Sequence, residues 1–191
     1  ICINRGVVHC TTYFNPLTSL LNMRYLSIIF LILVVSIGAL AQNAIRVGNA
    51  APQFAAPATD GSYYDLASMR GRVVVLTFWS TKCAICRSEI PKLNGFISKF
   101  DESAVVFLAP TLETDAKLEG FLRENPFNAH ILPNSFGLLL QYADRDREGN
   151  LDMGFPAYFV IDQKGNLAYR SSGWDRTNEL YSKITRLVSV D

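Results

Sequence analysis

The sequence has few of the residues that metal sites and nucleic-acid surfaces need. Its 191 residues include only four cysteines and two histidines, and the formal net charge is +1. A nucleic-acid-binding protein would show a basic excess, so no nucleic-acid partner is expected. There is no internal repeat or low-complexity tract. The hydrophobic content of 49% is enough for the core of one globular domain.

The N-terminal part differs from the rest in its long apolar run. The first methionine is Met23, and after Arg24 an apolar run covers Tyr25–Ala41. A charged start, an apolar stretch and a small-residue Ala-Leu-Ala site before Gln42 are the layout of a cleaved secretory signal. The alternative is an uncleaved membrane anchor, because about 17 apolar residues can just span a bilayer.

Residues 1–22 precede this signal, and we expect them to be an upstream extension that is not native. They begin without methionine, and their cysteines and histidine follow no clear periodicity. Both interpretations of residues 23–41 place residues 42–191 outside the cytoplasm, in the periplasm or another extracytoplasmic compartment. A tether through residues 25–41 would hold the domain at the membrane. Without residues 1–41 the net charge changes from +1 to −1, because two arginines and no acidic residue are lost.

Strand-like and helix-like patterns alternate along the rest of the chain. Continuous apolar runs predict buried strands, and apolar residues recurring at helical spacing predict helices. A turn-rich lead-in contains a hairpin near residues 58–66. The expected strands are residues 72–80, 104–110, 129–132, 156–162 and 166–173, and the expected helices are 84–100, 114–125, 135–142 and 177–188. The order predicts an α/β fold with a central mixed β-sheet flanked by helices on both faces.

Three local features of this pattern carry further expectations. Pro91 falls inside the first helix and should kink it, because proline removes a backbone hydrogen bond. Thr114 is expected to be the N-cap of the second helix. The polar segment Asp144–Asp152 resembles the start of a calcium loop, but the twelfth position is Phe155 rather than glutamate. We therefore expect an exposed loop there.

Cys83 and Cys86 lie three residues apart, between the first expected strand and helix. The spacing alone is compatible with a redox-active dithiol, part of a metal site or a structural disulfide. A zinc site needs three or four protein ligands, and residues 42–191 add only His130. A disulfide across one helical turn closes so short a loop that it restrains the unfolded chain little. A redox-active dithiol is therefore favoured.

The position of the two cysteines gives this redox role a physical basis. The first turn of a helix has free N–H groups and the positive end of the helix dipole, and both lower the pKa of a thiol. Cys83 has that position, so we expect it to attack. Cys86 lies on the same helical face, where it can resolve the mixed disulfide.

Longer stretches around these residues resemble a known family. VVVLTFWSTKCAICRSEIPKL resembles the strand, active-site motif and kinked helix of the thioredoxin superfamily, and GFPAYFVIDQKGNL resembles its second signature. The lead-in and the glutamate of CRSEIP are similar to the exported TlpA/ResA-like branch. The resemblance runs from about Val47 to the C-terminus. It implies a thioredoxin-like fold and an exported thiol:disulfide oxidoreductase that exchanges electrons with protein disulfides. We expect it to act as a reductase, and the direction of exchange depends on its redox potential.

The resemblance also implies roles for single residues. Cys83 would be the attacking thiol and Cys86 the resolving thiol. Pro156 corresponds to the family's cis-proline, which lies beside the dithiol; an ordinary trans proline is the alternative. Glu89 corresponds to an acidic residue that would relay the proton of the resolving thiol, with a solvated helix glutamate as the alternative. Trp79 corresponds to a tryptophan beneath the motif and is equally well explained as core.

Three positions depart from the family pattern. Lys82 stands where tryptophan is usual; its ammonium would favour a Cys83 thiolate, or it is simply a solvated turn residue. Ala84-Ile85 replaces a proline-containing dipeptide, which leaves the redox potential open. Thr77 replaces the buried aspartate of cytoplasmic thioredoxins, so Glu89 is the better candidate for proton transfer.

The expected chemistry needs no bound cofactor, because the Cys83–Cys86 disulfide itself carries two electrons. The expected partners are protein thiol or disulfide clients and a redox partner protein. One alternative is a peroxiredoxin-like peroxidase, although Leu76 and Ser80 stand where its proline and threonine precede the cysteine. The other is a non-enzymatic copper-binding chaperone that uses both thiols and His130.

Overall fold

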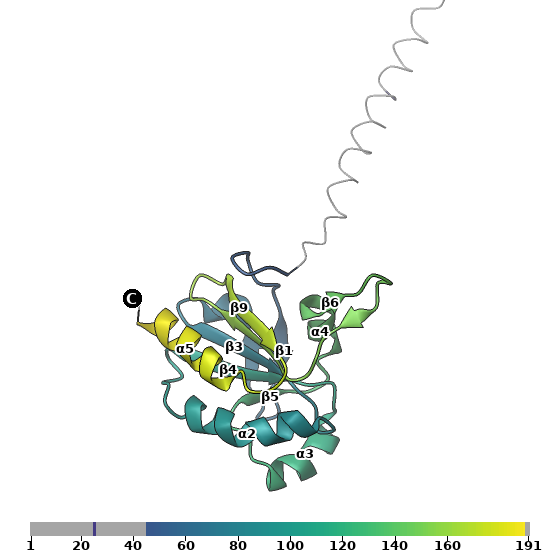
Figure 1. Cartoon of the computed structure of the whole chain (residues 1–191), viewed down its shortest axis with the longest axis vertical. Helices are drawn as coiled ribbons and strands as arrows, with labels where there is room; N and C mark the ends of the chain where they lie inside the picture. The colour runs from purple at the N-terminus through teal and green to yellow at the C-terminus, as the bar shows by residue number, and fades with distance from the viewer. Residues whose placement is uncertain (1–24, 26–44, 190–191) are drawn as a thin grey trace, which may run out of the picture. The chain divides into compact units, whose positions relative to one another are not determined.

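The computed structural model describes Tyr25 and residues 45–189 (Figure 1). The expectations for residues 1–22 and, apart from Tyr25, for the signal or anchor at residues 23–41 lie outside the described residues. None of the helices formed by the described residues has both the length and the apolar character of a membrane span.

A five-stranded mixed β-sheet forms the centre of residues 45–189, with the strand order β5-β4-β3-β8-β9. Neighbouring β3, β4 and β5 are parallel, whereas β8 is antiparallel to β3 and β9. The strands are β3 (Val73–Phe78), β4 (Val105–Pro110), β5 (His130–Leu132), β8 (Ala157–Ile161) and β9 (Leu167–Ser172). Every residue of β3, β4 and β8 is buried, as expected for strands that are covered on both faces.

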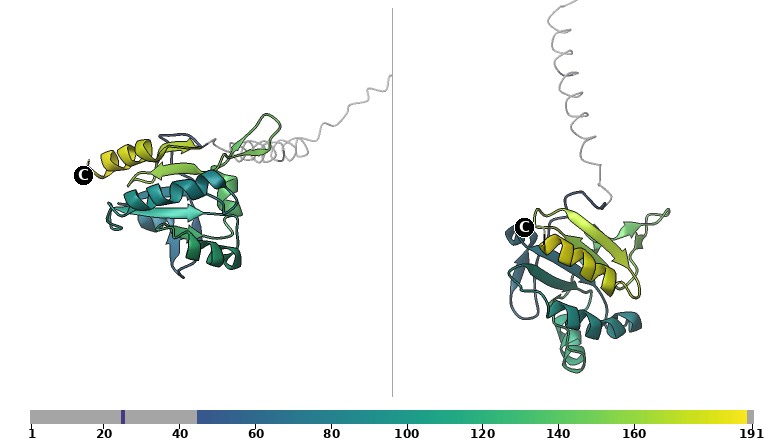
Figure 2. Two further views of the ribbon diagram at one scale, coloured as in Figure 1. Left: turned by 60° about the horizontal axis from the view of Figure 1, so that its bottom comes forward. Right: turned by 60° about the vertical axis from the view of Figure 1, so that its left-hand side comes forward.

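Helices pack on both faces of this sheet. They are α2 (Ala84–Ile97), α3 (Asp115–Glu124), α4 (Phe136–Tyr142), α5 (Thr177–Val188) and the short 3-10 helix η2 (Leu66–Met69). Figures 1 and 2 show α2 and α5 beside each other, and both share one core layer with α3. The other layer contains α4 and η2. Successive residues of β3 alternate between the layers, because side chains of a strand point to opposite faces: Val75 lies in the α2 layer and Leu76 in the α4 layer.

The predicted elements are present, with two local differences. Pro91 lies inside α2, and Thr114 is the N-cap of α3, as predicted. The Thr114 side chain makes no capping hydrogen bond, although its backbone carbonyl accepts the N–H groups of Lys117 and Leu118. The lead-in hairpin pairs β1 (Ala55–Pro57) with β2 (Tyr63–Asp65).

The segment expected to be an exposed loop, Asp144–Asp152, contains a short hairpin. β6 (Asp144–Arg145) pairs antiparallel with β7 (Leu151–Asp152). The carboxylate of Asp146 accepts hydrogen bonds from the backbone N–H groups of Glu148 and Asn150. Gly149, between these two residues, has φ 87°. These contacts close the turn and bring the two short strands into register.

Candidate active site

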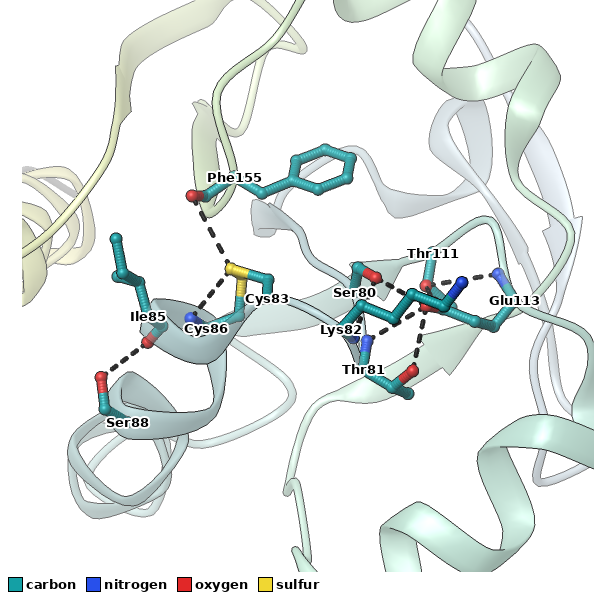
Figure 3. Close-up of a disulfide and its surroundings, with 10 residues drawn as sticks. All are labelled: Ser80, Thr81, Lys82, Cys83, Ile85, Cys86, Ser88, Thr111, Glu113 and Phe155. Carbon is teal, nitrogen blue, oxygen red and sulfur yellow. Dashed lines mark hydrogen bonds between the residues drawn. A yellow bond between two sulfur atoms is a disulfide. The ribbon is translucent and has the colours of Figure 1, made fainter.

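Cys83 and Cys86 form a disulfide at the N-terminal end of α2 (Figure 3). The buried strand β3 ends at Phe78, a short turn follows, and Cys83 is the N-cap of the helix. The backbone N–H of Cys86 donates to Cys83 Sγ at 3.1 Å, so the sulfur takes the position that a side-chain oxygen has in an ordinary N-cap. The same N–H and the helix dipole would stabilise a thiolate at Cys83.

The two sulfurs differ in their access to solvent. Cys86 is 2% exposed and packs in the α2 layer of the core, whereas Cys83 is half-buried. Disulfide exchange requires the attacking sulfur to meet a disulfide of another molecule. The accessible Cys83 therefore suits attack, and the buried Cys86 suits resolution within the protein.

The Phe155–Pro156 peptide bond is cis, as expected from the resemblance. The carbonyl oxygen of Phe155 lies 3.8 Å from Cys83 Sγ (Figure 3). The carbonyl oxygen of Pro156 accepts a hydrogen bond from the backbone N–H of Gly173 at 2.9 Å, which holds this segment against the chain that follows β9. The structure therefore brings Pro156 and both cysteines together.

Glu89 lies one turn beyond Cys86 on α2 and is 1% exposed. Its carboxylate accepts hydrogen bonds from Thr177 Oγ1 at 2.8 Å and from Lys92 Nζ at 3.1 Å. The hydrogen bond to Glu89 raises the pKa of Lys92. The alternative of a solvated helix glutamate is therefore wrong. Neither of these hydrogen bonds involves a cysteine, so the relay of a proton from Cys86 stays a prediction.

The remaining residues around the motif differ in exposure. Lys82 is exposed, beside the half-buried Cys83. Thr77 is buried within β3. Trp79 is buried as well: its Nε1–H donates to the carbonyl oxygen of Ala109 at 3.2 Å, and its ring packs against two phenylalanines. The core explanation of Trp79 therefore accounts for its contacts.

A second buried carboxylate, Glu113, was not predicted from the sequence. It lies between β4 and α3, is 9% exposed, and accepts hydrogen bonds from Ser80 and Thr81, just before the motif (Figure 3). Burial raises its pKa, but the hydrogen bonds from these residues and Thr111 lower it more, so the net pKa is lowered. One signal was available: β3 and β4 are parallel neighbours, so the segments after both strands meet at one edge of the sheet.

His130 contacts two carboxylates. Its Nδ1 lies 3.1 Å from Asp60 Oδ2, its Nε2 lies 3.0 Å from Glu102 Oε1, and its ring packs against Tyr64. Among the residues with described positions, no group of three or more His, Cys, Asp or Glu side chains is arranged to hold a metal ion. Because its two ring nitrogens contact these two carboxylates, neither nitrogen of His130 faces the sulfurs of Cys83 and Cys86.

A disulfide at a helix N-terminus, beside a cis-proline and on a mixed α/β sheet, defines a thiol:disulfide oxidoreductase of the thioredoxin fold. The comparisons with known proteins agree with this class. The chain belongs to the AhpC/TSA family, whose model matches residues 47–170.

The chain is similar to the thiol-disulfide oxidoreductase ResA of Bacillus thuringiensis (strain Al Hakam), with 26% identity over 149 residues, 75% of this chain and 80% of that protein. A thiol:disulfide interchange protein of Chlorobium tepidum TLS superposes with a TM-score of 0.63 at 21% identity, covering 76% of this chain and 99% of that one. The pneumococcal exposed lipoprotein thioredoxin of Streptococcus pneumoniae strain TIGR4 gives 0.58 at 22% identity, covering 71% and 100%. The solved structures confirm the predicted fold, and the named relative favours disulfide exchange over the peroxidase alternative.

Proposed function

We propose that the chain reduces disulfides of extracytoplasmic proteins through Cys83 and Cys86. The observation that carries the proposal is the unequal exposure of the two sulfurs, with the accessible one at the helix N-terminus beside Pro156. In this proposal the Cys83–Cys86 disulfide is the electron carrier, and no bound cofactor takes part.

In the first step the Cys83 thiolate attacks one sulfur of the client disulfide. A bond forms between Cys83 Sγ and that sulfur, and the client's other sulfur leaves as a thiolate, which takes a proton from solvent. The N–H of Cys86, which donates to Cys83 Sγ in the disulfide state, would stabilise the attacking thiolate. The backbone before Pro156 would pair with the client chain and hold it beside Cys83.

In the second step Cys86 attacks Cys83 Sγ, and the client's remaining sulfur leaves. Cys86 first has to lose its proton, and its buried position disfavours the charged thiolate. Glu89 would accept this proton and later return it to solvent. The net result is a client with two thiols and a protein with one disulfide, so two electrons pass from the protein to the client. A separate redox protein would then reduce Cys83–Cys86 again.

An exposed aromatic residue beside the site favours polypeptide clients. Trp174 is 60% exposed. It follows Gly173, whose backbone N–H donates a hydrogen bond to the carbonyl oxygen of Pro156. Lys92 Nζ lies 5.8 Å from the centroid of the Trp174 ring, where a cation is attracted to the ring face. Ile85, between the cysteines, is exposed as well. Apolar side chains near a client cysteine would find apolar partners here.

We further propose that the domain works outside the cytoplasm, exported by residues 23–41 as a cleaved signal or tethered through residues 25–41. Support comes from the apolar run in the sequence and from the likeness to a protein named an exposed lipoprotein thioredoxin. A reductase in such a compartment requires a supply of electrons from its redox partner, because disulfides persist there.

The test is reduction of a model protein disulfide by the pre-reduced domain. We expect Cys83→Ser to abolish activity and Cys86→Ser to stop after one mixed disulfide, while an exposed Ser88→Ala control stays active. Full activity of Cys83→Ser would refute the mechanism. Equilibration of Cys83–Cys86 with glutathione tests the reductase direction, because about 30 mV changes the equilibrium constant tenfold.

A further inference from the structure

Glu113 is a buried carboxylate that the exchange mechanism above does not use. Its Oε1 accepts three hydrogen bonds: from Ser80 Oγ at 2.6 Å, from Thr81 N–H at 3.1 Å and from Thr81 Oγ1 at 3.1 Å. Its Oε2 accepts a hydrogen bond from Thr111 Oγ1. Among the described residues, no lysine or arginine forms an ion pair with Glu113. Hydroxyl and amide donors alone therefore solvate this charge.

These donors belong to the turn that leads into the dithiol. Ser80 Oγ, which donates to Glu113, accepts a hydrogen bond from the backbone N–H of Lys82 at 3.2 Å. The carbonyl oxygen of Ser80 accepts the N–H of Cys83 at 3.1 Å. The N–H of Thr81 thus donates to Glu113 directly. The N–H groups of Lys82 and Cys83 donate to Ser80, whose side chain in turn donates to Glu113. Figure 3 shows the contacts of Glu113 with Ser80 and Thr81 to the right of Cys83.

The turn matters most after the disulfide has been reduced. In the oxidised protein Cys83 is bonded covalently to Cys86 on α2, but reduction removes this restraint. The reduced protein is the one that attacks a client, and exchange requires the attacking sulfur to be aligned with the client's disulfide. A misplacement of about 1 Å at a reacting atom can cost on the order of a hundredfold in rate.

We infer that Glu113 is a positioning residue for disulfide exchange: its ionised carboxylate fixes the turn Ser80–Lys82 and so holds Cys83 in its attacking position when the dithiol is reduced. The inference rests on the proposed function, because it assigns Glu113 a part in that reaction. Glu113 acts through the turn and does not touch the client.

The test compares reduced wild-type protein with Glu113→Gln, which keeps the shape of the side chain and removes its charge. We expect the rate constant for attack on a model protein disulfide to fall about tenfold. The control is Glu119→Gln, which removes an equal charge from the exposed face of α3 and should leave the rate unchanged. An unchanged rate in Glu113→Gln, with an active wild-type protein, would overturn the inference. An inactive wild-type protein would instead overturn the proposed function.

Amide hydrogen exchange gives a second readout that does not depend on activity. We expect exchange at Thr81 and Lys82 to be at least tenfold faster in reduced Glu113→Gln, and exchange at Val75 and Leu76 in β3 to be unchanged. Equal acceleration at all four amides would mean a general loss of stability and would overturn the positioning role, as would unchanged protection at Thr81.

The pH dependence of this protection separates the charge from the shape of the side chain. The hydrogen bonds keep the pKa of Glu113 below its ordinary value of 4.5, so the carboxylate is ionised above that pH. Protection at Thr81 should therefore fall in wild-type protein as the pH drops through the lowered pKa, and Glu113→Gln should lack this step. The same step in both proteins would contradict the inference.

The alanine variant of Ser80 keeps the inference testable if Glu113→Gln folds poorly. Ser80→Ala removes the shortest of the Oε1 contacts and the acceptor for the N–H of Lys82. We expect its rate to fall severalfold. The double variant should lose less than the product of the two single losses, because both act on the same turn. Independent, multiplicative losses would overturn the inference.

Discussion

Replacing Glu89 by glutamine should slow the second step of exchange and leave the first step intact. The carboxylate is buried one turn beyond Cys86, and glutamine cannot accept a proton from the resolving thiol. Loss of a positioned general base typically costs 10²- to 10⁴-fold, so we expect the mixed disulfide to persist about a hundredfold longer. Attack by Cys83 should change less than about threefold, because Glu89 makes no hydrogen bond to it.

The same substitution has a stability cost that the structure allows us to bound. The acceptor of the hydrogen bond from Thr177 Oγ1 changes from a charged to a neutral group. The contribution of this hydrogen bond to stability therefore falls from about 1.5–3 to about 0.5–1.5 kcal/mol. We therefore expect about 1 kcal/mol of lost stability in urea unfolding, too little to unfold the domain. Thr177→Val removes this hydrogen bond and keeps the carboxylate, so it controls for the stability loss.

The assay mixes reduced protein with a disulfide-containing client, quenches with acid at timed intervals and measures free protein, mixed disulfide and oxidised protein by mass spectrometry. The mixed disulfide should accumulate in Glu89→Gln and stay transient in wild-type protein and in Thr177→Val. Resolution in Glu89→Gln within about threefold of the wild-type rate would refute the proton-relay role. Equal slowing in Thr177→Val would show that packing, and not the base, sets the rate.

Three further predictions concern the client surface, acid stability and the core. Trp174→Ala should lower kcat/KM for a protein disulfide severalfold and leave kcat/KM for a small-molecule disulfide unchanged. The control Tyr63→Ala, which removes a 68% exposed aromatic from β2, should change neither value. Equal effects of Trp174→Ala on both substrates would argue against a surface for polypeptides. The hydrogen bond from the backbone N–H of Ser62, and then that with His130, lowers the pKa of Asp60. The stability that the ionised Asp60 contributes should therefore be lost as the pH falls through that lowered pKa. The stability of Asp60→Asn, measured by urea unfolding, should lack this pH dependence. Leu118→Ala, at a fully buried position of α3, should cost about 2–5 kcal/mol in urea unfolding, and a cost below about 1 kcal/mol would contradict the described packing.

The secondary structure and the dithiol were largely predictable because their signals are local. The continuous apolar run of β3 and the helical spacing in α2 and α5 reflect burial, which the sequence encodes directly. The cis bond before Pro156 was predicted only through the family resemblance, since proline by itself is compatible with either isomer.

The role of Glu113 was not predictable in the same way. Ser80 and Glu113 are 33 positions apart. The parallel pairing of β3 and β4 brings the segments after both strands to one edge of the sheet, but nothing local in either segment indicates that these two side chains meet there. The burial of Glu89 depends similarly on Thr177, which comes from the last helix of the domain. The hairpin in Asp144–Asp152 was missed because its strands are only two residues long, too short for an alternating pattern.

The most direct test of the central claim, that the accessible Cys83 attacks and the buried Cys86 resolves, is to locate the mixed disulfide with a client. Reduced Cys86→Ser and Cys83→Ser proteins are each mixed with the same protein disulfide, trapped with acid and mapped by peptide mass spectrometry. The account predicts one client molecule covalently bound at Cys83 in Cys86→Ser and no comparable adduct in Cys83→Ser. An adduct at Cys86 that forms as fast as the one at Cys83, or no adduct at Cys83, would contradict it.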